Sequence, residues 1–277
     1  MKKILVIAIL LLSAGVVSCG SSSVTSTYTV SVALTGLATS KTVVFQNNSG
    51  DNLTMTSNTT TAFTTALADG STYSVAVSSQ PSNETCTVTS GSGTISGANV
   101  TVNASCVFDV KVIFITAATT TGNIGSIAAA DALCAADANK PDAGTYKAMI
   151  VDGPNRQACT SAGCTVGGAS EHTDWVLSAS TAYYRPDGTT AIATTTSNGV
   201  FNLVTELTNS FSATSYGVWS GMLGDWTTSP GGSCTNWSSS AGGESANYGD
   251  TSKKDTNAIS TAVQACSTSS YLACVEQ

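Results

Sequence analysis

The densest group of chemically active side chains is Glu171-His172-Thr173-Asp174, which contains the only histidine of the chain. Carboxylates beside an imidazole are suited to a metal site or to acid–base chemistry. The alternative, which we favour, is a loop leading to Trp175 whose side chains cap local backbone groups. Serine is too abundant for a Ser–His–Asp triad to carry weight, and the Gly-x-Ser-x-Gly nucleophile elbow is absent from the sequence. We therefore predict no catalytic residue and no enzymatic activity.

The segment from Asp137 to Gly144 has the composition of a calcium loop. It lacks the alternating ligand register and the closing glutamate that such a loop uses. Cys-x-x-Cys pairs are also absent from the sequence, so a zinc site of cysteine and histidine ligands is not expected. Calcium-dependent lectin-like domains carry Glu-Pro-Asn or Gln-Pro-Asp followed by Trp-Asn-Asp, and the sequence has neither. We predict no metal and no other cofactor, with sugar binding as an alternative function.

Cys19 could carry a covalent lipid. It follows Met1-Lys2-Lys3, an apolar run over residues 4–12 and Val16-Val17-Ser18. This order is typical of a signal peptide, and the run is too short to span a bilayer comfortably. The segment before Cys19 resembles a bacterial lipobox. This resemblance implies that residues 1–18 are removed and that Cys19 is acylated, with palmitate among the acyl groups. The alternative is an ordinary secretory signal with a chance cysteine. We expect residues 19–26 to be a lipidated tether and the protein to lie at the outer membrane or cell surface.

The charge of the chain excludes several classes of partner. Loss of Lys2 and Lys3 leaves 8 of the 10 basic residues against 17 acidic ones, a formal charge of −9. Nucleic acid is not expected as a partner, because it requires a basic surface. Only 10% of the residues are charged, against about 25% in an average domain. A surface rich in Ser, Thr, Asn and Gly suits an exported β-structure.

Residues 27–107 have the pattern of a β-sandwich. Short runs alternate with period two and are separated by turn residues, as in Tyr28–Val32, Val43–Gln46, Leu53–Met55, Tyr73–Val77 and Val100–Val102. Eight cysteines remain after Cys19, an even number that predicts four disulfides. Cys86 and Cys106 both lie near strand ends, and we expect them to pair. The unit resembles the small immunoglobulin-like modules of bacterial surface proteins. We expect a spacer here, with a ligand-binding sandwich as the alternative.

Residues 108–277 predict a mixed α+β domain. The segment from Val110 to Thr116 is apolar on both faces, which indicates a central strand. Ser126 can cap a helix that runs to about Ala138. Cys159 and Cys164 are close enough to close a small loop. The apolar face of this helix is expected to carry Ile127, Ala130, Cys134 and Ala138. Further strands are expected at 146–151, 175–177, 216–219 and 271–275.

Several of these residues resemble endostatin, a variant of the C-type lectin-like fold. The similar elements are the helix that bears Cys134, the segment Tyr146-Lys147-Ala148, Val218-Trp219-Ser220-Gly221, Cys234-x-x-Trp237, and the step from Cys266 to Cys274. The resemblance implies nested disulfides, Cys134 with Cys274 and Cys234 with Cys266. Cys159 with Cys164 is then an additional pair. The histidine cluster that holds zinc in endostatin has no counterpart near Phe108–Thr116. Heparin is not expected as a partner, because the chain has only Arg156 and Arg185.

A closer similarity is to the leptospiral endostatin-like surface proteins. It is carried by 144–148, 171–177 and the terminal Cys-Val-Glu-Gln. The resemblance implies an adhesin that binds host laminin, fibronectin, factor H or plasminogen. The alternatives are a carbohydrate-binding lectin-like module and a structural envelope lipoprotein without a host ligand.

The four tryptophans, Trp175, Trp219, Trp226 and Trp237, could form a binding face. We expect Trp219 and Trp237 to pack in the core, each with a partner for its indole N–H. Trp226 lies in the turn-rich Gly224-Asp225-Trp226-Thr227 and is predicted to be the exposed, ligand-binding aromatic, since interfaces favour tryptophan.

Overall fold

A computed structural model describes residues 25–277 of the chain. The predicted signal peptide 1–18, the predicted lipidation site Cys19 and most of the predicted tether 19–26 lie outside the described residues. Across residues 25–277 the regular structure is mostly β-strand with a few short helices, which confirms the β-rich character of the prediction. The described part of the chain contains no helix long and apolar enough to cross a membrane.

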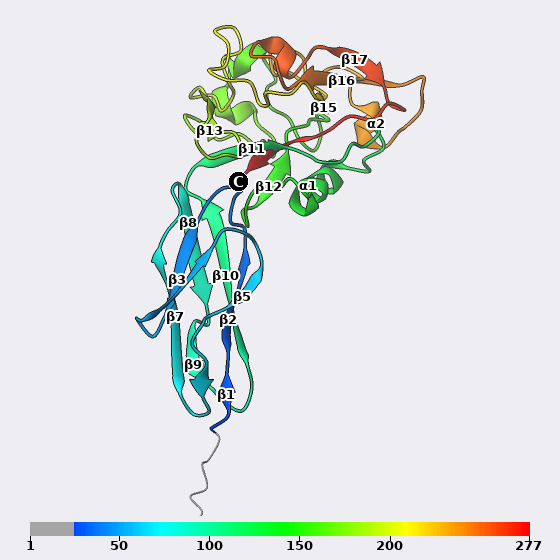
Figure 1. Cartoon of the computed structure of the whole chain (residues 1–277). Helices are drawn as coiled ribbons and strands as arrows, with labels where there is room; N and C mark the ends of the chain where they lie inside the picture. Colours follow the sequence, from blue (N-terminus) through cyan, green and yellow to red (C-terminus); the bar gives the residue numbers. More distant parts are fainter. Residues whose placement is uncertain (1–24) are drawn as a thin grey trace, which may run out of the picture.

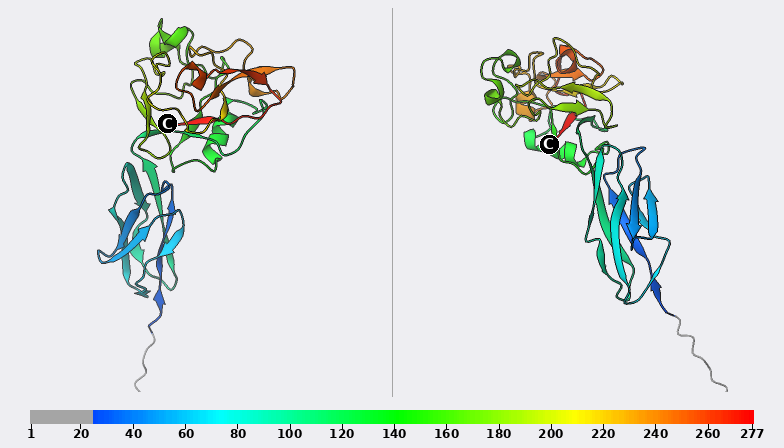
Figure 2. Two further views of the ribbon diagram at one scale, coloured as in Figure 1. Left: turned by 45° about the horizontal axis from the view of Figure 1, so that its top comes forward. Right: turned by 90° about the vertical axis from the view of Figure 1, so that its left-hand side faces the viewer.

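The chain forms two units that lie end to end, a lower unit of residues 25–108 and an upper unit of residues 109–277 (Figures 1 and 2). Strand β10 (Val100–Phe108) ends the lower unit, and β11 (Lys111–Ile115) begins the upper one. The first described strand, β1 (Thr27–Tyr28), lies at the far end of the lower unit. The molecule is therefore elongated, with its amino-terminal end opposite the upper unit.

The lower unit consists of two four-stranded sheets around one apolar core. Alternate residues of each long strand point into this core, as in β2 and β3, so the period-two pattern of the sequence is realised. One sheet has the order β5-β2-β10-β8, with β2 and β10 parallel, and the other has the order β4-β3-β7-β9. Their bounds are β2 Val30–Thr35, β3 Val43–Asn47, β4 Asp51–Met55, β5 Thr60–Ala62, β7 Thr72–Ser79, β8 Glu84–Thr89 and β9 Ser92–Thr94, while β6 (Leu67–Ala68) pairs with β1.

A five-stranded sheet with β11 at its centre organises the upper unit. Its order is β12-β18-β11-β13-β14. Ile113 and Ile115 of β11 enter one apolar core, whereas Val112 and Phe114 enter a second one. Both faces of the strand are therefore buried, which confirms the prediction of a central strand. The neighbours of β11 are β12 Tyr146–Ala148, β13 Ala182–Tyr184, β14 Ala191–Thr194 and β18 Ala273–Glu276.

Helix α1 (Ile127–Ala136) covers the second of these cores. Ser126 caps it as predicted, because its Oγ accepts a hydrogen bond of 3.1 Å from the backbone N–H of Ala129. Ile127, Ala130 and Cys134 are buried. The helix ends at Ala136, slightly before the predicted end near Ala138, and the prediction that Ala138 lies on its buried face is wrong, because Ala138 is exposed. Asp137 turns the chain outward, because its carboxylate accepts hydrogen bonds from the backbone N–H groups of Ala117 and Asn139.

The rest of the upper unit is a small sheet and long loops. The sheet has the order β15-β16-β17, with β15 Gly217–Trp219, β16 Ser245–Asp250 and β17 Ala262–Ala265. Single helical turns occur at α2 Cys234–Trp237, η1 Ala162–Cys164, η2 Gly168–Glu171 and η3 Thr256–Ala258. The strand predicted at 175–177 does not form. Val176 and Leu177 are instead buried in irregular backbone, so burial alone produced the apolar pattern.

Candidate functional site

Glu171 anchors its own loop. Its two carboxylate oxygens accept hydrogen bonds from the backbone N–H groups of Thr160, Ser161 and Gly167, at 2.6–2.7 Å, and from the hydroxyls of Thr160 and Ser161. These bonds, with the Ser161 hydroxyl first, hold the pKa of the Glu171 carboxyl well below its ordinary value. A carboxylate whose lone pairs are used in this way is a loop-closing group rather than a free acid or base.

His172 does not join Glu171 or Asp174 in an acid–base pair. Its Nε2 lies 3.6 Å from Sγ of Cys164, which is in a disulfide. Its ring lies 6.3 Å from the ring of Trp175, centroid to centroid. Burial lowers the pKa of His172, which favours the neutral ring. The geometry around this segment matches the capping loop that we favoured from the sequence.

Asp174 belongs to a buried arginine cluster that the sequence did not reveal. The Arg156 side chain is fully buried and pairs with Asp131 through Nη1 and Nη2, both at 2.8 Å, and with Asp174 through Nη2 at 2.5 Å. Its Nε also donates to the backbone carbonyl of Asp174, and Nη1 to that of Ala148. Lys147 binds Asp174 from the solvent side. The cluster ties helix α1, strand β12 and the 171–174 loop together. A signal for it was present, since Arg156 is one of two arginines in a weakly charged chain.

Four disulfides join the pairs expected from the sequence. Cys86 pairs with Cys106, and the resemblance-based pairs Cys134–Cys274 and Cys234–Cys266 are both present, as is Cys159–Cys164. Cys134–Cys274 joins helix α1 to the last strand, β18. It therefore connects the beginning of the upper unit to its end.

The tryptophan predictions had mixed outcomes. Trp219 and Trp237 are buried in the core and donate their Nε1–H groups to the carbonyls of Thr120 and Val151, as expected. The prediction that Trp226 is exposed is wrong, because only 2% of Trp226 is exposed. Its Nε1 donates to the carbonyl of Phe201 at 3.0 Å, and its ring packs edge-on against Trp175. The neighbouring Leu223 and Asp225 are exposed, whereas Trp226 is buried.

Trp226 nevertheless forms one wall of an apolar cavity of about 470 Å³, which we call the distal pocket. Its other walls come from η1 and from the loop over 196–204, which includes Phe201, Leu203 and Val204. Val204 is 89% exposed, and Val166, one residue from the lining Thr165, is 88% exposed. These segments lie at the end of the upper unit away from the lower one (Figure 1). Val166 and Val204 have the largest exposed fractions among the large apolar residues of 25–277, so their neighbourhood is an unusual apolar surface.

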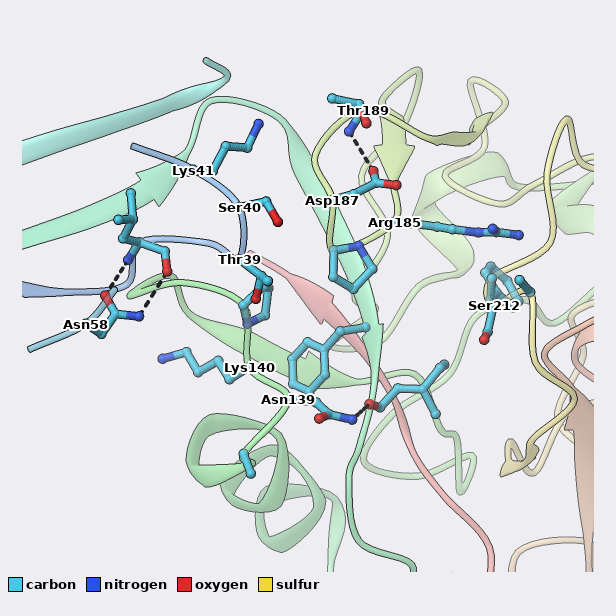
Figure 3. A pocket seen from close by; sticks show the side chains of 18 of the residues that line it. Thr39, Ser40, Lys41, Asn58, Asn139, Lys140, Arg185, Asp187, Thr189 and Ser212 are labelled. Atoms are coloured by element: carbon cyan, nitrogen blue, oxygen red, sulfur yellow. Dashed lines mark hydrogen bonds between the residues drawn. The ribbon is translucent and has the colours of Figure 1, made fainter. Parts of the chain in front are cut away.

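A second cavity, of about 880 Å³, lies between the two units, and we call it the junction cleft. Figure 3 shows Ser40, Lys41 and Asn58 from the lower unit on one side. Arg185 and Ser212 of the upper unit lie on the other side, and Lys140 lies with Asn139 in the loop after helix α1. The lining combines hydroxyl, amide and cationic groups with apolar side chains such as Leu37, Phe114 and Phe211, from segments far apart in the sequence.

Buried carboxyls lie close to this junction. Asp142 of the upper unit accepts a hydrogen bond of 2.6 Å from the backbone N–H of Phe108 and another of 2.8 Å from the hydroxyl of Tyr146. Glu276 accepts one from the backbone N–H of Val112. Burial, reinforced by the charge of Asp142, raises the pKa of Glu276 to about 7. Burial also raises the pKa of Glu84.

The segment from Asp137 to Gly144 uses its carboxylates for the backbone. Asp137 caps Asn139 and Ala117, and Asp142 binds Phe108, Gly144 and Tyr146. Within residues 25–277, histidine, cysteine and acidic side chains form no group of three or more that could hold a metal ion. The described carboxylates act as structural acceptors in this segment.

A comparison with protein families finds one described as "Protein of unknown function (DUF1554)". Its model matches residues 117–256, just over half of the 277 residues and entirely within the upper unit. The matched range contains the arginine cluster, the distal pocket and part of the junction cleft. No curated protein matches the chain.

Proposed function

The chain belongs to the DUF1554 family, and we propose that it is a bacterial surface lipoprotein whose upper unit binds host extracellular-matrix or plasma proteins. The partners implied by the sequence resemblance are laminin, fibronectin, factor H and plasminogen. The proposal treats the chain as a binding module and not as an enzyme, in keeping with the capping role of Glu171 and the structural role of Asp174.

The observation that carries the proposal is the distal pocket with its exposed valines. An apolar cavity of about 470 Å³ is of the size that accepts an anchoring side chain or a small ligand. Hot spots of protein interfaces are commonly buried anchors in such pockets, surrounded by contacts that exclude water. Val204, which lines the pocket, and Val166, which follows the lining Thr165, add highly exposed apolar surface to these segments.

The positions of strand β1 and the distal pocket at opposite ends of the molecule support the same proposal. We propose that Cys19 is acylated and that residues 19–26 tether the protein to the membrane. Strand β1 then begins at the membrane end, and the lower unit separates the distal pocket from the lipid surface (Figure 1). A spacer of this kind presents the distal loops to partners outside the cell.

We further propose that the lower unit is an immunoglobulin-like spacer and the upper unit an endostatin-like domain of the C-type lectin-like class. For the lower unit, the support is the pair of facing sheets around one core. For the upper unit, it is the nesting of Cys234–Cys266 inside Cys134–Cys274, together with the buried Trp219 and Trp237.

Binding of soluble residues 19–277 to immobilised laminin, fibronectin, factor H and plasminogen tests the function. We expect saturable binding to at least one of them. The double substitution Val166→Asp and Val204→Asp should weaken it at least about tenfold, because two charges would have to be desolvated at the contact. Both side chains are almost fully exposed, so the thermal unfolding of the protein should not change.

Val263→Asp is the matched control. Val263 is 59% exposed but lies on β17, outside the residues that line the distal pocket. Its substitution should leave binding unchanged. Equal losses in the control and the double variant, or no binding by folded protein to any of the four partners, would refute the proposal.

A further inference from the structure

We propose that the junction cleft is a calcium-independent binding site for an acidic oligosaccharide that contacts both units. This inference concerns a different surface from the distal pocket and does not depend on the host-protein function proposed above.

Positively charged side chains are concentrated in the junction cleft. Residues 25–277 contain eight lysines and arginines, within a chain whose net charge is −7. Three of the eight, Lys41, Lys140 and Arg185, line this one cleft. Asp187 is the only acidic residue of the lining, and it is occupied by the backbone N–H groups of Thr189 and Thr190. The lining therefore has an excess of positive charge, which raises the local concentration of ligands of the opposite sign.

Two of these cationic side chains have hydrogen-bond donors that are not used within the described residues. The Lys140 amine makes no hydrogen bond or ion pair within residues 25–277, and its nearest aromatic contact is the Tyr146 ring at 5.9 Å. Arg185 donates Nε and Nη2 to Ser210, which fixes the guanidinium, while Nη1 has no partner among the described residues. Arginine held in this way is pre-organised for a carboxylate.

The three cationic side chains are spread over the cleft, and this spacing favours a ligand with several acidic groups. Figure 3 shows that Lys41, Lys140 and Arg185, which all line the cleft, point in different directions and do not converge on one point. A single phosphate or carboxylate would reach only one of them. A chain of uronate sugars carries one carboxylate on each ring and so presents its charges at intervals.

The hydroxyl groups and rings of the lining favour a saccharide over an acidic peptide. The cleft is also lined by the hydroxyls of Thr39 and Ser40, by Asn139, whose amide donates to the carbonyl of Ile115, and by the rings of Pro186 and Tyr216. The hydroxyls of Thr39, Ser40 and Tyr216 make no side-chain hydrogen bond within the described chain. A sugar offers hydroxyls around its whole edge and apolar C–H faces for the rings. Because the protein supplies the cations, no bridging calcium ion is required.

The test is calorimetric titration of soluble residues 19–277 with oligogalacturonate in the presence of EDTA. We expect saturable binding that weakens as salt is added. The same saccharide with its carboxylates methyl-esterified should not bind measurably. The double substitution Lys41→Gln and Lys140→Gln should lower the affinity at least about tenfold, because two charge-assisted contacts are lost.

The matched control is Lys253→Gln with Lys254→Gln, which removes the same charge from exposed lysines outside the cleft. It should change the affinity less than about twofold. The absence of saturable binding, or an equal loss in both double variants, would overturn the site. Oligoglutamate of the same number of carboxylates is the third titrant, and binding as tight as that of oligogalacturonate would overturn the assignment to a saccharide.

Discussion

The lower and upper units reach a stable fold by different means. In the lower unit, two sheets surround one core, and the continuous β2–β10 and β8–β10 ladders each pair six residues. In the upper unit the strands are short, and side chains connect segments that no ladder joins. These connections include three disulfides, the Arg156 cluster and the tryptophan N–H groups bound to distant carbonyls.

The difference shows how a chain can display long loops without losing rigidity. Loops carry most binding residues, but they need a scaffold to hold their conformation. Here the scaffold includes Arg156, Glu171 and Trp226, which bind backbone groups of the loops themselves. The upper unit should therefore be much more sensitive than the lower unit to the loss of individual polar side chains or disulfides.

The largest expected effect comes from the disulfides. Cys134–Cys274 joins residues 140 apart, which corresponds to about 5 kcal/mol in the chain-entropy model. Its replacement, Cys134→Ala with Cys274→Ala, should unfold the upper unit or lower its free energy of unfolding by several kcal/mol. Tryptophan fluorescence measures this selectively, because all four tryptophans lie in the upper unit.

Cys86→Ala with Cys106→Ala is the counterpart in the lower unit. These cysteines are 20 residues apart, so the same model gives about 3 kcal/mol. They also face each other in the β8–β10 ladder, which keeps the strands paired without the bond. Far-ultraviolet circular dichroism should still show a folded lower unit, and the tryptophan signal should be unchanged. A collapse of both units in either variant would contradict the comparison.

Arg156→Ala should have the next largest effect. It leaves the carboxylates of Asp131 and Asp174 without their buried partner, together with the carbonyls that Arg156 binds. Breaking a buried pair costs roughly 3–5 kcal/mol, and we expect a value near 3 because both carboxylates are partly exposed. The melting temperature of the upper unit should fall by roughly 10 °C. Lys147→Ala, which removes the solvent-exposed partner of Asp174, should cost less than about 1 kcal/mol. Equal effects of the two substitutions would show that the buried cluster is not a structural tie.

The smallest expected effect is a dependence of stability on pH. Burial raises the pKa of Glu276 to about 7, above that of an unfolded glutamate, so the folded state binds the proton more tightly. This contribution is complete at low pH and is lost as the pH rises through about 7. Urea unfolding followed by tryptophan fluorescence should show stability falling by on the order of 1–3 kcal/mol between pH 5 and pH 8. In Glu276→Gln most of this slope should disappear, and an unaltered slope would rule out Glu276 as its source.

The sequence allowed the regular parts of the molecule to be predicted. Period-two alternation located β2, β3, β4, β7 and β10, and the doubly apolar run located β11. It did not reveal β5 or β9, whose small residues are mostly exposed, or β8, which alternates in burial but places the charged Glu84 at a buried position. Ser126 correctly predicted the start of helix α1. Its end was misplaced because the backbone contacts of Asp137 are not visible in a hydrophobic pattern.

The candidate sites were much harder to predict. The four disulfide pairs followed from spacing and resemblance, since cysteines mark their own positions. Trp226 was predicted to be exposed and is buried, with its residue among those that line the distal pocket, because the turn residues around it do not indicate where the ring points. The junction cleft combines Lys41, Lys140 and Arg185 from distant segments, and only the packing of the two units brings them together.

The most direct test of the central claim is hydrogen–deuterium exchange of residues 19–277, alone and bound to whichever of the four host proteins binds most tightly. The account predicts protection on binding over residues 162–166 and 200–206, around the distal pocket, and unchanged exchange over residues 25–108. Protection confined to the lower unit, or spread evenly over the chain, would contradict the claim that the distal end of the upper unit is the binding surface.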